Sequence, residues 1–272
     1  MWPGTYHVGM LKLQDAYLKL ERAKGHIEDL EKAQGAYFGS EPYKGAPEYD
    51  PTSNMTFFVL KDVPEIPRAI SLYIGDAAHN LRTALDYLAC ALVRHSGTEP
   101  GSVYFPIAEN AERYADESPK RTKGMAPDVK QLIDDLKPHG QGNLGFYVLH
   151  LLDIIDKHRM LPIFATSVES WNVRLAGQKG IVGFNMPHNR NSPFGLKKGD
   201  TIGSIFGNHA ADKEMSVTVL IAFREPYLLE GLPVLRTLKE LAAMVEGTLR
   251  YFESKLATPA AAGQKPAQRS GA

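Results

Sequence analysis

The stretch from Ser71 to Val93 contains no lysine and no glutamate, and this absence constrains the fold more than any other feature of the chain. Lysine and glutamate are the side chains that usually cover the solvent-facing side of a helix. The stretch still has a helical period, because its main apolar residues recur at intervals of three and four: Ile70, Ile74, Ala77, Leu81, Leu85, Leu88 and Leu92. The sequence therefore predicts a central helix over 67–96 that other elements enclose on all sides.

The opposite arc of this helix carries polar and ionisable side chains. They are Asp76, His79, Asn80, Arg82 and Asp86. Burying a carboxylate or a guanidinium without a partner costs several kcal/mol, so these groups need partners from another element. A second segment of the same kind, 138–152, has no charge apart from histidines and belongs to a predicted helix over 143–159. We expect the two helices to pack together and Arg82 to pair with Asp153 or Asp156.

The rest of the chain predicts two outer helices and a β-rich segment. Apolar residues at threes and fours predict helices over 6–35 and 233–256, which are expected to pair with each other. Between 163 and 225 the period changes to two, which is typical of strands. Smaller features are a strand over 55–60, a short helix over 127–137, and irregular segments over 38–54 and 111–125.

The predicted fold class is α+β and mainly α. It is a bundle of about four long helices with a small antiparallel β-sheet inserted before the last helix. Residues 1–256 are expected to form a single domain, with 163–225 as its β-rich insertion. Residues 257–272 are rich in Ala, Gly, Pro and Gln, which predicts a disordered tail.

Composition limits the partners and the compartment. Lys plus Arg and Asp plus Glu are both 31, so the chain lacks the net positive charge that drives strong non-specific DNA binding. No apolar run approaches the roughly 18 residues of a membrane span, and the start lacks the pattern of a signal peptide. The single cysteine, Cys90, excludes an intramolecular disulfide, and we expect a cytoplasmic protein.

Three segments together resemble a widespread group of uncharacterised bacterial and phage proteins. They are 74–88 (IGDAAHNLRTALDYL), 104–107 (YFPI) and 155–161 (IDKHRML). The resemblance implies a shared helical architecture and carries no established activity.

The central helix also resembles, more distantly, HEPN domains, helical bundles that include many RNases of toxin and defence systems. Their motif is an arginine, four to six residues, then a histidine; here Arg82 is followed after four residues by Tyr87. The resemblance implies metal-independent RNA cleavage in which Arg82 stabilises the phosphorane charge. His79 or His158 would exchange protons with the 2′-hydroxyl and the leaving oxygen, and Asp86 would orient one of them. No cofactor is then required, and RNA is the expected partner.

Other interpretations remain open. A non-catalytic scaffold or interaction protein would use the same polar cluster only for packing, and a homodimer is compatible with either function. Asp76 with His79, and His150 with Asp153, would each place two ligands on one helical face, as in bundles that hold metal ions. The motif from Gly140 to Gly145 has the glycine spacing of a dinucleotide-binding loop, but no strand precedes it, so a turn and a helix cap are predicted.

Overall fold

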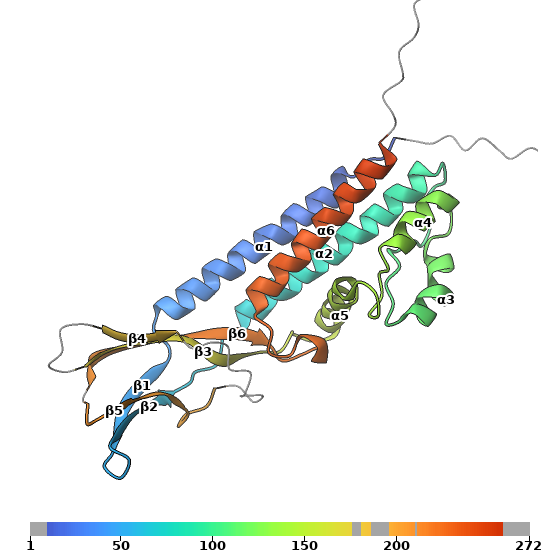
Figure 1. Ribbon diagram of the computed structural model, residues 1–272. Helices are drawn as coiled ribbons and strands as arrows, with labels where there is room; N and C mark the ends of the chain where they lie inside the picture. The colour runs from blue at the N-terminus through green and yellow to red at the C-terminus, as the bar shows by residue number, and fades with distance from the viewer. Residues whose placement is uncertain (1–9, 176–180, 186–195, 210, 258–272) are drawn as a thin grey trace, which may run out of the picture.

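The computed structural model describes residues 10–175, 181–185, 196–209 and 211–257. Within this part of the chain three long helices lie side by side (Figure 1): α1 (Gln14–Gly39), α2 (Arg68–His95) and α6 (Val234–Leu256). The strands gather at one end of these helices, and the shorter helices α3 (Ala111–Arg121), α4 (Pro127–Asp135) and α5 (Leu144–His158) pack beside α2. The fold is α+β and mainly α, as the sequence predicts.

The core of the bundle follows the apolar periodicity. The buried residues of α1 are spaced by three and four: Ala16, Leu20, Ala23, Ile27 and Leu30. Ion pairs on the outside confirm the predicted pairing of α1 with α6, because Lys24 bonds Glu246 and Lys239 bonds Glu31, each at 2.9 Å between nitrogen and oxygen. The first predicted helix was expected to start at residue 6, which lies outside the described residues. Residues 10–13 are described and are not helical, so that part of the prediction is wrong.

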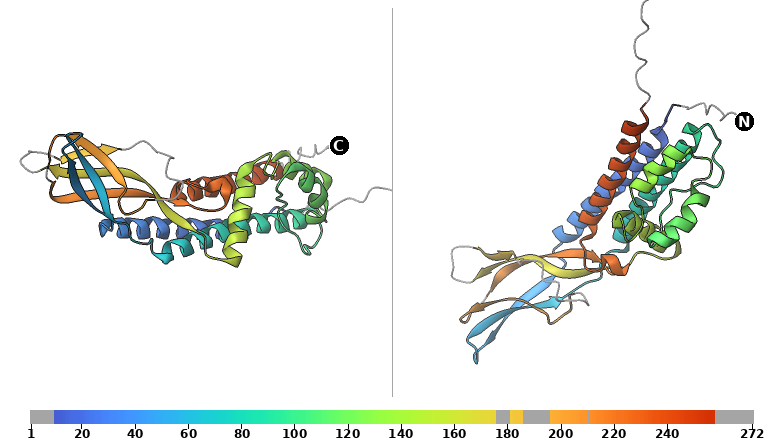
Figure 2. Two further views of the ribbon diagram at one scale, coloured as in Figure 1. Left: turned by 90° about the horizontal axis from the view of Figure 1, so that it is seen from below. Right: turned by 45° about the vertical axis from the view of Figure 1, so that its right-hand side comes forward.

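α5 does not run along the other helices. Figure 1 views α5 almost end-on while α1, α2 and α6 lie across the picture, and the left view of Figure 2 shows α5 crossing α2. The prediction of about four long helices in one bundle is therefore not confirmed: three helices are aligned, and α5 packs across α2. Asn143 caps the N-terminus of α5 as expected, its side chain accepting a hydrogen bond from the Gly145 amide at 3.3 Å.

The strands form two three-stranded antiparallel sheets instead of one. One sheet has the order β1 (Lys44–Asp50), β2 (Met55–Asp62), β5 (Thr201–Phe206). The other has the order β4 (Ile181–Asn185), β3 (Ile163–Leu175), β6 (Ala211–Phe223). Because β1 and β2 precede α2 in the chain, the prediction of a single sheet confined to 163–225 is corrected. The sheets share a small core of their own: Tyr43, Phe58, Leu60, Ile202 and Val219.

Two segments expected to be irregular are regular. Residues 44–50 form β1 although they include Gly45 and Pro47, because β1 is an edge strand, where a missing proline N–H is tolerated. Residues 111–121 form α3, which buries only Ser118 and therefore lacks an apolar stripe. This helix starts at Asn110, whose side chain accepts a hydrogen bond from the Arg113 amide at 2.9 Å. The predicted tail lies almost wholly outside the described residues.

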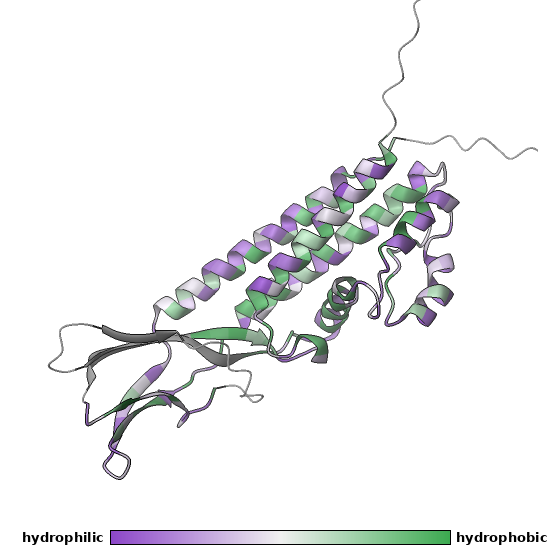
Figure 3. Cartoon of the chain, in the orientation of Figure 1, coloured by the Kyte–Doolittle hydropathy of each residue, from purple (hydrophilic) through white to green (hydrophobic). Residues whose placement is uncertain are grey.

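Hydropathy is distributed as burial requires. Figure 3 shows α5 predominantly hydrophobic, whereas hydrophilic and hydrophobic residues alternate along α1. None of the helices in the described part of the chain is both long enough and apolar enough to cross a membrane.

The glycine motif before α5 is used for close packing. A Cβ on Gly140 would lie 2.4 Å from the Glu109 carbonyl oxygen, and one on Gly142 would lie 2.5 Å from the Lys137 carbonyl oxygen. A Cβ on Gly145 would meet the Met244 sulfur of α6 at 2.6 Å. The motif thus lets a turn and the start of α5 approach their neighbours, which agrees with the turn and cap that the sequence predicts.

We expect Gly140→Ala and Gly142→Ala each to lower the free energy of unfolding by about 1–3 kcal/mol, because the methyl group meets backbone that cannot move aside. Urea denaturation measures the change. Gly35→Ala in α1 is the matched control: a Cβ there meets nothing within 4 Å, so alanine should stabilise the helix by about 0.5–1 kcal/mol. Equal effects at all three positions would contradict this account of the motif.

Candidate functional site

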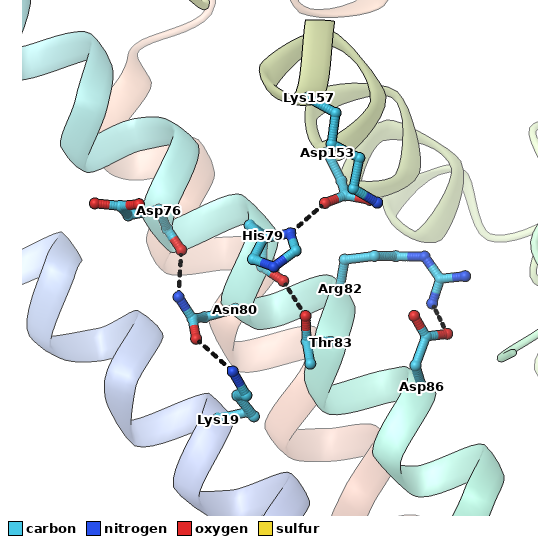
Figure 4. Close-up of polar contacts among 9 residues, drawn as sticks. All are labelled: Lys19, Asp76, His79, Asn80, Arg82, Thr83, Asp86, Asp153 and Lys157. Atoms are coloured by element: carbon cyan, nitrogen blue, oxygen red, sulfur yellow. Dashed lines mark hydrogen bonds and ion pairs between the residues drawn. The ribbon is translucent and has the colours of Figure 1, made fainter.

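A buried carboxylate joins α5 to α2. Asp153 is 2% exposed, and its Oδ1 lies 2.9 Å from Nδ1 of His79 on α2. Its Oδ2 accepts a hydrogen bond from Nζ of Lys157, one turn further along α5, at 2.6 Å. Figure 4 shows His79 and Asp153 facing each other across the two helices, with Lys157 beside them. One carboxylate therefore holds two potential cations in fixed positions.

His79 is accessible from solvent although its partner is not. Its side chain is 48% exposed, because it lies on a stripe of α2 that none of the described helices covers. The stripe is continuous at helical spacing: Leu72, Asp76, His79 and Tyr87 are exposed and Thr83 is half-buried. The expectation that α2 is enclosed on all sides is therefore wrong along this line. In a neutral imidazole whose Nδ1 donates to Asp153, the lone pair is on Nε2, where a ligand can reach it.

The prediction that Arg82 pairs with Asp153 or Asp156 is wrong. Its Nη1 donates to Asp86 on its own helix at 2.6 Å, and its Nη2 donates to the Phe105 carbonyl at 3.0 Å. The Phe105 amide in turn donates to Asp86 at 2.9 Å. Residues four apart lie on one helical face, so Asp86 is the carboxylate of α2 itself that Arg82 can reach. This closed set, in which Arg82 is only 5% exposed, fastens the segment after α2 to the middle of that helix.

Burial changes the acidity of two carboxyls near α2. Burial raises the pKa of Asp86 above its usual range, while Arg82 and the Phe105 amide act in the opposite direction. Burial also raises the pKa of Asp156, and the negative charges of Asp76 and Asp153 add to the effect. Asp156 lies directly over Gly75 of α2, where a Cβ would fall 1.8 Å from its Oδ1. The glycine thus allows α5 to approach α2 closely beside the Asp153 contact.

The far side of the stripe is bordered by α1. Nδ1 of His26 lies 3.8 Å from Oδ2 of Asp76, and Nζ of Lys19 donates to the Asn80 side chain at 3.4 Å. Asp76 thus turns toward α1 while His79 turns toward α5. Among the described residues no group of three or more His, Cys, Asp or Glu side chains is arranged to hold a metal ion, so the four side chains of the alternative metal site do not form one.

His150 lies apart from this cluster. Its Nδ1 is buried and has no hydrogen-bond partner within the described part of the chain. Burial lowers the pKa of His150 to about 4, and the positive charge of Arg82 contributes in the same direction. His150 is therefore a neutral packing residue at physiological pH.

The structure brings together only part of the predicted set. Arg82 and Asp86 form one group, and His79 belongs to another with Asp153. His158 is exposed at the end of α5 and forms no hydrogen bond or ion pair with any described residue. Two contributions were not predicted. Lys157 lies four residues after Asp153, a spacing that indicates an ion pair on one helical face. The Phe105 contribution comes from its backbone, which no side-chain pattern reveals.

Comparisons with known proteins add no assignment to this geometry, because no family model, no curated protein and no solved structure matches the chain.

We expect Arg82→Met to lower the free energy of unfolding by about 3 kcal/mol, since it removes the guanidinium from a partly buried carboxylate and leaves the Phe105 carbonyl without its donor. Chemical denaturation of the two proteins measures the loss. Arg236→Met, which removes an exposed i,i+4 pair on α6, should leave stability unchanged. A loss below about 1 kcal/mol for Arg82→Met would show that the closed set contributes little.

His150 should make stability depend on pH. The unfolded chain binds a proton near the ordinary histidine pKa of 6.5, whereas the folded protein resists protonation down to about 4. The free energy of unfolding should therefore fall as the pH drops from 6.5 to 4, by roughly 1–2 kcal/mol for this partly buried group.

The measurement is denaturation of the wild type and of His150→Leu across that pH window. The raised pKa values of Asp86 and Asp156 act with the opposite sign in both proteins, so the difference isolates His150. His158→Gln, at an exposed position, should retain the wild-type slope. Identical slopes in the wild type and His150→Leu would contradict the prediction.

Proposed function

We propose that this chain is an RNA-cleaving enzyme of the HEPN-like kind, that it works without a metal ion, and that His79 is its proton-transfer group. One observation carries the proposal: a half-exposed imidazole has its Nδ1 held 2.9 Å from a carboxylate that is itself buried. A buried acceptor fixes both the orientation and the tautomer of a histidine, which leaves Nε2 as a base directed to solvent. Histidine is also the side chain best suited to proton transfer near neutral pH.

The chemistry follows from these positions. Nε2 of His79 removes the proton from a ribose 2′-hydroxyl, and the 2′-oxygen then attacks the adjacent phosphorus. The bond from phosphorus to the 5′-oxygen breaks, giving a 2′,3′-cyclic phosphate. The departing 5′-oxygen takes a proton from water, and the imidazolium that remains on His79 is stabilised by Asp153.

Charges around His79 restrict how a phosphodiester can lie. Nζ of Lys157 is bound to the other oxygen of Asp153 and its side chain is 53% exposed, so it offers a positive charge to the developing phosphorane. Asp76 is an exposed carboxylate on the opposite side, where it repels a phosphate. The substrate is therefore expected to place its phosphate toward α5 and its sugar above α2.

The roles that the HEPN resemblance implies for the other residues change in this proposal. Arg82 and Asp86 serve to hold the Phe105 segment and do not touch substrate. His158 is too isolated to act with His79 through any contact in the described residues. The resemblance to HEPN domains then depends on the position of α2 within a group of helices, and not on Arg82.

The test is incubation of the purified protein with a labelled single-stranded RNA in EDTA. We expect a 2′,3′-cyclic phosphate product, no cleavage of the DNA of the same sequence, and a loss of at least about 100-fold in His79→Gln. Asp153→Asn should lose activity as well, because the amide can present the wrong hydrogen-bonding group to Nδ1.

The variant His158→Gln distinguishes a site in which His79 transfers the proton from one in which His158 does so. We expect full activity in this variant. His209→Gln, on the segment after β5, is the control for a histidine outside the helices. Cleavage that survives in His79→Gln, or that follows His158 instead, contradicts the proposal.

A non-catalytic scaffold or interaction protein is the second candidate. It is favoured by the closed set around Arg82, in which Arg82 and Asp86 bond each other and the Phe105 backbone. A wild-type protein that is folded and inert toward RNA, with variants at His79 changed only in stability, would support the scaffold function.

A further inference from the structure

A pocket of about 490 Å³ lies where the helices meet the sheets. Its walls come from five places: the 63–66 linker before α2, the first turn of α2, the 160–162 linker after α5, the adjoining ends of the β3–β6 sheet, and Leu196 before β5. Figure 2 shows this junction between the three long helices and the two sheets. Pockets of about 300–1,000 Å³ are the usual size for small ligands, so this junction pocket is large enough for one.

Slightly less than half of the pocket wall is apolar. Its apolar side chains include Val63, Ile66, Leu161, Pro162, Ile163 and Phe164. Such a wall suits a hydrocarbon or ring portion of a ligand, because contact with it removes apolar surface from water.

Two unpaired arginines supply the charge. Arg68 and Arg224 line the pocket, and neither forms an ion pair with another residue in the part of the chain that the structure describes. The Arg224 guanidinium lies 5.4 Å from the centre of the Phe164 ring, which positions it against the apolar wall. Glu225 does not neutralise Arg224, because it pairs with Arg159. Glu65 is the single carboxylate among the described lining residues, so the lining has a net positive charge.

The Ser71 side chain adds a hydroxyl group to the same pocket wall. Ser71 lines the pocket, is 5% exposed, and forms no side-chain hydrogen bond with any described residue. It lies in the first turn of α2, whose N-cap, Pro67, provides no side-chain hydrogen bond. The first N–H groups of a helix lack intrahelical partners and carry a partial positive charge, so the hydroxyl and the helix end together can donate hydrogen bonds to an anion.

We propose that the junction pocket binds a small organic anion, in which a carboxylate or phosphate head contacts Arg68, Arg224 and Ser71 and an apolar body lies against Phe164 and its neighbours. The site is separate from the proposed catalytic group, because Ser71 and His79 are eight positions apart on α2, or about 12 Å along the helix axis. The pocket therefore gives the chain a binding function that does not depend on RNA cleavage.

The test is calorimetric titration of the whole chain with four probes. Octanoate and octyl phosphate carry both parts of the proposed ligand, octanol carries the apolar part alone, and inorganic phosphate carries the head alone. We expect saturable binding of at least one of the first two, at least about tenfold tighter than either part. Preference for octanoate or for octyl phosphate identifies the head group.

The double variant Arg68→Gln, Arg224→Gln should weaken that binding by about tenfold or more, and Ser71→Ala should weaken it less. Both arginines are exposed, so the double variant should keep the circular dichroism spectrum and thermal midpoint of the wild type. Arg250→Gln, near the other end of the helices, is the matched control and should bind as the wild type does. Absence of saturable binding, octanol binding as tightly as the anions, or unchanged affinity in the double variant would overturn the proposal.

Discussion

The buried carboxylate of Asp153 is the interaction on which the packing of α5 across α2 depends. A carboxylate that is 2% exposed must have donors, because leaving such a charge unpaired costs several kcal/mol. It has two, His79 from α2 and Lys157 from α5 itself. Asp156 beside it lies against Gly75, where a Cβ would fall 1.8 Å from the Asp156 Oδ1, so a larger residue would displace that side chain. The Asp153 contact that joins the helices also holds His79 in a defined orientation.

The helices could largely be predicted from the sequence, because their apolar periods report which face is buried. The absence of lysine and glutamate from 71–93 correctly indicates that α2 is the innermost helix, since it packs against α1, α5 and α6. The absence of lysine and glutamate does not show that α2 is enclosed on all sides, because a solvent-exposed stripe of a helix can also consist of other residue types. Leu72 and Tyr87 are exposed there without any charge to reveal it.

Features that depend on distant chain segments could not be predicted in this way. The residues of β1 do not look like a strand because they include Gly45 and Pro47, and they form one because β2 pairs with them. β5 pairs with β2 in the same sheet although it lies more than a hundred positions away in the chain. The partners of Arg82 were misassigned for a related reason. The sequence shows that a carboxylate is needed, and a carboxylate four positions along the same helix satisfies that need as well as one from another helix. The final donor and acceptor, at Phe105, are backbone groups that every residue carries.

The central claim is that the Asp153 carboxylate holds His79 in one tautomer with Nε2 open to solvent. Nitrogen NMR of the protein labelled at its histidine rings, at neutral pH, tests this claim most directly, with His79→Gln identifying the signals. The account predicts a protonated Nδ1 and an unprotonated Nε2 for His79, and loss of this preference in Asp153→Asn. A proton on Nε2, or an average of both tautomers as in a free imidazole, would contradict it.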